Sequence, residues 1–186
     1  MSNRTTSIAA FLLIGTMFLL AVLSMKDDAL TFDELAHIPA GYSYLTTRDY
    51  RINPEHPPLA KDLAALPLLF LDLNFPSQSQ NWKQDSGAPP WWVQFDLGNE
   101  FLYQSGNDPR AIIFWARLPI IFLTLALGVF LFFWAKKIGG NAVGLGVLAL
   151  FAFSPTFLSH GRLITTDVMA AFGAVFAMYY WLEFLS

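Results

Sequence analysis

The chain has 186 residues, of which 55% are hydrophobic and 13% are charged, and it contains no cysteine. Soluble domains usually carry about a quarter charged residues, so this composition argues against an ordinary soluble globule and against disorder. The absence of cysteine excludes disulfides, cysteine-ligated zinc and thiol catalysis. A net charge of −3 offers no basic face for nucleic acid, which we therefore exclude as a partner.

Apolar stretches long enough to cross a membrane occur at four places in the chain. A helix needs roughly 17–25 residues to cross the hydrocarbon core of a bilayer. We predict an all-α polytopic membrane protein with four transmembrane helices, at residues 8–25, 112–135, 142–158 and 167–186. The first stretch could instead be a signal peptide, but its 18 residues without a charge favour an uncleaved helix.

The charged residues gather between the first two helices. Residues 26–110 contain twelve of the fourteen acidic side chains and form a large loop. Lys136 and Lys137 lie in the short turn at 136–141, and the positive-inside rule places that turn in the cytoplasm. The large loop and the 159–167 loop then face outward. We expect an integral membrane protein, in the plasma membrane if bacterial, with its active face outward.

Two segments of the large loop have the apolar spacing of amphipathic helices. The first, 32–44, begins after Thr31, with Glu34 placed for a capping box, and has Pro39 inside it. Its apolar stripe consists of Leu35, Ile38, Tyr42 and Leu45. The second, 57–71, has a stripe of Leu59, Leu63, Leu66 and Phe70. We expect both helices to lie on the outer leaflet; the alternative is a small folded domain that packs the same faces together.

The rest of the large loop is rich in Pro, Gln, Asn, Ser and Gly and reads as irregular structure. We predict loop over residues 74–109, including the exposed-looking run of Pro89, Pro90, Trp91 and Trp92.

A few ionisable residues lie where the predicted helices meet the outer surface. Asp33 and Glu34 are adjacent carboxylates beyond the first helix, and Asp167 begins the fourth. An ionisable group entering a membrane helix is costly and is a functional candidate, although an acid is also favoured at a helix N-terminus by the dipole. Arg117, in the second helix, could extend to the headgroups or bind an anion such as phosphate. The topology brings these residues to one rim, which suggests a site for a polar group, such as a lipid-linked phosphate, at a lipid surface.

Four motifs in order resemble those of a known family. They are Phe-Asp-Glu at 32–34, Asn-Pro-Glu-His-Pro-Pro-Leu-Ala-Lys at 53–61, Ala-Arg-Leu-Pro at 116–119, and the segment from Phe-Ser-Pro at 153–155 to Thr-Thr-Asp at 165–167. Together they resemble the N-terminal part of the GT-C glycosyltransferases. Within that group the chain is most similar to the branch that contains protein O-mannosyltransferases and the bacterial aminoarabinose transferase of lipid A.

The resemblance implies an inverting transfer of a sugar from a polyprenyl-phosphate-linked donor to a protein, lipid or polymer acceptor. It implies that Asp33 is the general base and that Glu34 is its neighbour in the acceptor site. It also implies that Asp167 is a second acidic residue of the catalytic site, placed near the acceptor or a divalent metal. Arg117 would bind the donor phosphate. His56 and Lys61 would contact the donor or support the helix of their motif.

The resemblance leaves the cofactor unknown. If a divalent metal ion is used, Asp33 and Asp167 are its expected ligands. His37 lies one turn after Asp33 and could share its site, and His160 is expected to support Asp167.

Two further expectations concern the whole protein. Family members are several times longer, so we expect residues 1–186 to be a single N-terminal membrane module and a fragment of a longer protein. The alternative to a transferase is a non-catalytic transporter or assembly subunit that binds a cation or polar solute at its outer acidic rim.

Overall fold

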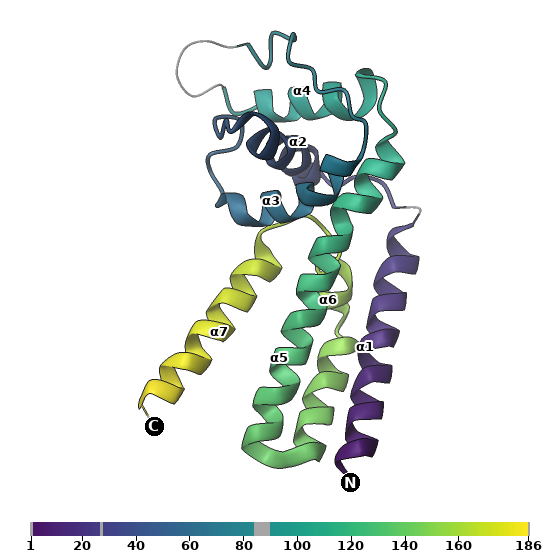
Figure 1. The fold of residues 1–186 in the computed structure, drawn as a ribbon, viewed down its shortest axis with the longest axis vertical. Helices are drawn as coiled ribbons and strands as arrows, with labels where there is room; N and C mark the ends of the chain where they lie inside the picture. Colours follow the sequence, from purple (N-terminus) through teal and green to yellow (C-terminus); the bar gives the residue numbers. More distant parts are fainter. Residues whose placement is uncertain (1, 27, 84–89, 186) are drawn as a thin grey trace. The chain divides into compact units, whose positions relative to one another are not determined.

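The computed structural model describes residues 2–26, 28–83 and 90–185, and all regular structure in these residues is helical (Figure 1). The all-helical class is therefore confirmed. The chain divides into two compact units, which we describe separately. The acidic unit comprises Asp28–Ile120 and a short segment, Leu163–Thr166, which we call the strap. The span unit comprises Met1–Asp27, Ile121–Arg162 and Asp167–Ser186.

Three helices are long and apolar enough to cross a membrane: α1 (Asn3–Met25), α5 (Pro109–Ala152) and α7 (Asp167–Leu185). The hydroxyl of Ser2 begins α1 by accepting the N–H of Thr5 at 3.2 Å, so this helix starts before the predicted residue 8. The predicted end of the fourth helix, Ser186, lies outside the described residues.

The second and third predicted helices are two arms of α5. Gly140 interrupts this element with φ 77° and ψ −170°, a conformation open to glycine because it has no Cβ. The chain turns back at this point (Figure 1). The second arm ends at Ala152, and a separate short helix, α6 (Pro155–His160), follows. The prediction of one continuous helix over 142–158 was wrong, because the residue before Pro155 is held in an extended conformation.

The acidic unit is built around α2 (Phe32–Thr47). Against it pack α3 (Pro58–Ala65), a single 3₁₀ segment η1 (Leu66–Phe70) and α4 (Val93–Asn99), which continues into the π-helical turn η2 (Glu100–Gln104). The side chain of Glu34 accepts the backbone N–H of Thr31 at 3.0 Å, as the capping box predicts. Pro39 lies within α2, and the helix continues past it to Thr47.

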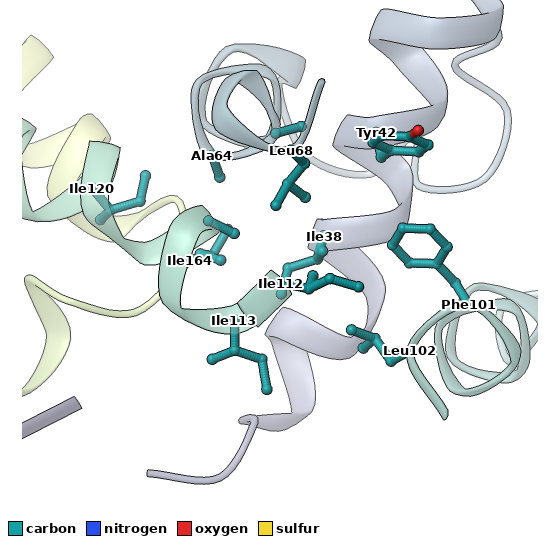
Figure 2. Close-up of a cluster of buried hydrophobic side chains, with 12 residues drawn as sticks. Ile38, Tyr42, Ala64, Leu68, Phe101, Leu102, Ile112, Ile113, Ile120 and Ile164 are labelled. Carbon is teal, nitrogen blue, oxygen red and sulfur yellow. The ribbon is translucent and has the colours of Figure 1, made fainter. Parts of the chain in front are cut away.

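The apolar stripe of α2 lies in the core of the acidic unit and not on a free surface. Ile38 and Tyr42 pack there against residues of α3, η1, η2, the start of α5 and the strap (Figure 2). The leaflet-facing prediction for this helix was therefore wrong, and the alternative of a folded domain is correct for it. Figure 2 labels Ala64, Leu68, Phe101, Leu102, Ile112, Ile113, Ile120 and Ile164 around the two α2 residues.

The apolar stripe predicted for 57–71, in contrast, lies largely on the surface of the acidic unit. Its leucines 59 and 66 are exposed, and Phe70 is 90% exposed. The helix instead buries its small face, Ala60, Ala64 and Ala65, against α2. Gly41 allows this close approach, since a Cβ there would lie 2.2 Å from the carbonyl oxygen of Lys61.

The prediction of loop over residues 74–109 was wrong for residues 93–104, which form α4 and η2. The buried positions Val93, Leu97 and Phe101 recur every four residues, a helical spacing that was readable from the sequence. Pro89 lies outside the described residues.

Candidate functional site

The adjacent carboxylates at the start of α2 have different environments. Asp33 is exposed, whereas Glu34 is fully buried. Successive helical residues point about 100° apart, so neighbours in sequence reach different surroundings. Asp33 is therefore the member of the pair that can meet a substrate.

Glu34 forms a buried ion pair with Arg117. The Nε and Nη2 atoms of Arg117 donate to Oε1 and Oε2 of Glu34 at 2.8 and 2.6 Å, and neither side chain is exposed. Burial raises the pKa of Glu34. The hydrogen bond and charge of Arg117, with the N–H groups of Thr31 and Ile164, outweigh burial and hold the pKa below its ordinary value of 4.5.

Arg117 also holds the chain before α2, through a 2.9 Å bond from Nη2 to the carbonyl of Ala29. Its remaining amino group, Nη1, is buried and finds no hydrogen-bond partner among the described residues. The side chain thus joins α5 to α2 and to the segment before it, in a place closed to solvent. The predicted contact of Arg117 with a donor phosphate stays a prediction.

Two side chains of α2 form hydrogen bonds to the backbone of one residue of the strap. Glu34 Oε1 accepts the N–H of Ile164 at 3.1 Å, and His37 Nδ1 lies 2.7 Å from the Ile164 carbonyl. A carbonyl only accepts, so the proton of the His37 ring is on Nδ1. Glu34 and His37 are three residues apart, so they share one face of the helix.

His37 is buried, and burial is the main cause that lowers its pKa from the usual 6.5. The bond to Ile164 and the charge of Asp33 oppose this shift, while the charges of Lys61 and His56 add to it. The ring of His56 meets the His37 ring edge-on, with 5.4 Å between centroids. His56 is itself exposed. His37 is therefore neutral at pH 7 and connects the strap to the neighbourhood of His56 and Asp33.

Lys61 is fully buried and points into its own motif. Four oxygens lie within hydrogen-bond distance of its Nζ and share its three N–H groups: Asn53 Oδ1 at 2.6 Å, the Asn53 carbonyl at 2.7 Å, the His56 carbonyl at 2.9 Å and the Tyr44 hydroxyl at 3.2 Å. Burial lowers the pKa of Lys61 to about 8, against the opposing charges of Asp62 and Glu55. The contacts match the structural alternative for Lys61, which shapes the loop that presents His56.

Glu55 is a polar centre that the sequence analysis did not single out. The indole Nε1 of Trp91 donates to its Oε2 at 3.2 Å, and Gln94 Nε2 donates to its Oε1 at 3.0 Å. These two hydrogen bonds, that of Gln94 being the larger effect, lower the pKa of Glu55. Asn53 joins the network by donating to both Glu55 and Gln94. The sequence signal for Glu55 was its position beside His56 in the 53–61 motif, but nothing in the sequence indicated that its carboxylate would meet Trp91.

Asp167 belongs to the span unit, where it begins α7 and is exposed. It shares with His160 a pocket of about 300 Å³, so the structure brings these two predicted residues together. The pocket is lined by Thr156, Phe157, His160, Asp167, Val168 and Ala171.

The structure offers no built metal site in the part of the chain that it describes: no three His, Asp or Glu side chains there lie close enough together to hold a metal ion. Asp33 and Asp167, the expected ligands, belong to different units. We therefore derive no chemical step through a metal.

Comparison with known proteins gives a family match over nearly the whole chain. Residues 7–186 match the model of the family described as dolichyl-phosphate-mannose-protein mannosyltransferase. The match includes all four motifs that carry the resemblance. None of the curated proteins and none of the solved structures matches the chain.

Proposed function

The chain belongs to the dolichyl-phosphate-mannose-protein mannosyltransferase family, and on that premise we propose that it transfers a sugar from a polyprenyl-phosphate-linked donor to an acceptor hydroxyl at the outer membrane face. The family implies a lipid-linked sugar donor and a protein acceptor. Transfer to a hydroxyl requires a group that takes up the hydroxyl proton. The observation that carries the assignment is the contrast at the start of α2, where Asp33 is exposed and Glu34 is occupied by Arg117.

In the proposed reaction, Asp33 acts as the general base. Its carboxylate takes the proton of the acceptor hydroxyl as the oxygen attacks the anomeric carbon of the donor sugar. The bond from that carbon to the phosphate oxygen breaks, and the polyprenyl phosphate leaves with the bonding electron pair. Attack opposite the leaving group inverts the configuration of the sugar. His56, which is exposed and whose charge, like that of Asp33, acts on His37, is our candidate for contact with the leaving phosphate.

The buried charged residues support this site from behind. Glu34 and Arg117 fix the start of α2 and hence the position of Asp33. Lys61 fixes the loop that carries His56. We propose positioning roles for all three, because none exposes its charged group to a substrate. Asp167 remains our candidate for a second acidic residue, at the start of α7.

We also propose how the chain crosses the membrane. The two arms of α5 would cross separately, which with α1 and α7 gives four crossings. Lys136 and Lys137, just before Gly140, then mark the cytoplasmic end of this hairpin by the positive-inside rule. The acidic unit faces outward in this arrangement.

The proposal is tested with the intact protein in liposomes that contain polyprenyl-phosphate-mannose, together with an acceptor peptide rich in Ser and Thr. We expect Asp33→Asn to lower the transfer rate by at least about 100-fold, the usual contribution of a general base. The matched control is Asp72→Asn, which neutralises another exposed carboxylate of the acidic unit and should leave transfer unchanged.

Both variants are also compared with the wild type by thermal unfolding, so that loss of fold is recognised. Transfer by a well-folded Asp33→Asn protein at more than a tenth of the wild-type rate contradicts the assignment of the base. A product that retains the anomeric configuration contradicts the single displacement.

A further inference from the structure

Three aromatic rings lie together on the acidic unit, and one of them belongs to Phe32, the residue that precedes Asp33 in the chain. The ring of Phe32 stacks on that of Phe95 at 4.2 Å between centroids, and Trp91 meets Phe95 at 4.8 Å and Phe32 at 6.3 Å. We call Phe32, Trp91 and Phe95 the aromatic platform. Phe32 is 62% exposed and Trp91 is 58% exposed, so the platform presents ring surface and does not fill a core.

A polar network holds the indole of Trp91, one of the three rings of the platform, in place. Glu55 accepts the indole N–H of Trp91, and Gln94 bonds both to Glu55 and to the backbone carbonyl of Trp91. Gln94 is itself buried and takes a hydrogen bond from Asn53. An exposed ring that is already oriented loses little conformational entropy when a ligand binds. The platform therefore has the preorganisation of a binding surface.

The charges around the platform indicate what kind of ligand fits it. Glu55 accepts the hydrogen bond of the Trp91 indole, so a carboxylate borders the platform at this ring. Ionised carboxylates accept hydrogen bonds and donate none, and they favour a ligand with many hydroxyl groups. The electron-rich face of an aromatic ring attracts positively polarised hydrogens. A pyranose offers both features, with C–H groups on one face and hydroxyls at its edge.

A lipid surface is the other occupant that exposed aromatic rings could meet. Immersing the platform in hydrocarbon would desolvate the carboxylate of Glu55, which is costly. The acidic border therefore favours a sugar over a bilayer.

We propose that the aromatic platform, with Glu55 at its edge, is the subsite that binds the sugar ring of the lipid-linked donor. This inference rests on the proposed function, because Asp33 would act next to the sugar carbon that is attacked. Trp91 is thus a substrate-binding residue that packs against the sugar, and Glu55 orients both the indole and the sugar hydroxyls.

The test measures sugar binding and catalysis separately on the intact protein. Binding is followed by saturation-transfer NMR with methyl α-mannopyranoside as the probe, and catalysis by the KM for polyprenyl-phosphate-mannose. We expect Trp91→Ala to weaken binding and raise the donor KM about tenfold. Trp91→Phe, which keeps a ring but loses the bond to Glu55, should have an effect of about two- to threefold. Trp92→Ala is the matched control: this neighbouring tryptophan is 61% exposed, lies outside the platform and should change neither quantity.

The outcomes separate this proposal from the proposed function. Asp33→Asn should bind the probe while failing to transfer, so a chain without transferase activity can still confirm the subsite by binding. Unchanged probe binding and unchanged donor KM in folded Trp91→Ala would overturn the subsite and leave the function intact. An increase confined to the KM of a glycosylated acceptor peptide would overturn the assignment to the donor sugar. A Trp92→Ala effect as large as that of Trp91→Ala would also overturn it.

Discussion

The buried pair of Glu34 and Arg117 gives the sharpest prediction about stability. The carboxylate of Glu34 accepts five donors: two from Arg117, two from Thr31 and the N–H of Ile164. Glu34→Gln replaces one oxygen with an amide that cannot accept, and it leaves the guanidinium buried without its counter-charge. Removing one partner of a buried ion pair costs about 3–5 kcal/mol. For a protein of this size, that loss lowers the melting temperature by roughly 6–20 °C.

The measurement is thermal unfolding of the detergent-solubilised protein, with the Lys137–Glu183 pair as the control. That pair has the same 2.6 Å separation, but its side chains are 55% and 40% exposed. Ion pairs open to solvent contribute little to stability, so Glu183→Gln should barely change the melting temperature. The contrast isolates burial as the cause, because the separation is equal.

A double-mutant cycle tests the coupling directly. Arg117→Met removes the charge that Glu34→Gln leaves unpaired, so the double variant should be less unstable than the two losses added together. The coupling free energy expected for two residues in contact is about 0.5–3 kcal/mol. If the losses are additive, or if Glu34→Gln melts within about 2 °C of the wild type, the reasoning about this pair is refuted.

Three further predictions concern the packing around α2. The pKa of His37 in the folded protein lies below 6.5, so as pH falls the unfolded chain binds a proton at this residue before the folded protein does. The unfolding free energy of the wild type should therefore fall below pH 6.5, and fall further below pH 4.5 because of Glu34. In a pH series of denaturant unfolding, His37→Gln, which keeps a donor for Ile164, should lack the first of these two losses. Lys61→Met removes the ammonium group that donates to the carbonyls of Asn53 and His56, so amide hydrogen exchange at these two residues should become faster while α5 stays protected. Unchanged exchange would argue against the role of Lys61 in holding this loop. Gly41→Ala should destabilise the fold, since its Cβ would meet a backbone oxygen, whereas Gly146→Ala, with open space around it, should stabilise it by up to about 1 kcal/mol; thermal unfolding that ranks the two in the opposite order would contradict the packing of α2 on α3.

Periodicity predicted which segments are helical better than it predicted where their faces point. The stripes at 32–44 and 57–71 look alike in sequence, yet Ile38 lies in a core and Phe70 is exposed. An apolar stripe records only that a face avoids water, and both a protein core and a lipid surface satisfy that condition. The turn at Gly140 and the start of α6 at Pro155 depend on the backbone conformations of glycine and proline themselves, and such local effects can be predicted from the sequence.

The candidate site was predictable where the residues are close in sequence. The capping role of Glu34 follows from its spacing to Thr31. The roles that the motifs predict for Asp33 and His56 stay predictions. The partners of Glu34 were not predictable, because Arg117 and Ile164 lie 83 and 130 residues away in the chain. For Lys61 the sequence left donor contact and structural support open. Its burial among oxygens of its own loop depends on packing that no local pattern predicts.

The grip of α2 on the strap has a consequence for synthesis. His37 meets the carbonyl of a residue made 127 positions later. At translation rates of roughly 5–20 residues per second, that delay is about 6–25 s. During this interval α2 can form its own hydrogen bonds, but Glu34 and His37 lack the backbone groups that they hold in the finished fold. The start of α2, which carries Asp33, therefore becomes fixed only after Ile164 has been synthesised. A pause in translation before Ile164 prolongs the time during which Glu34 and His37 lack these partners.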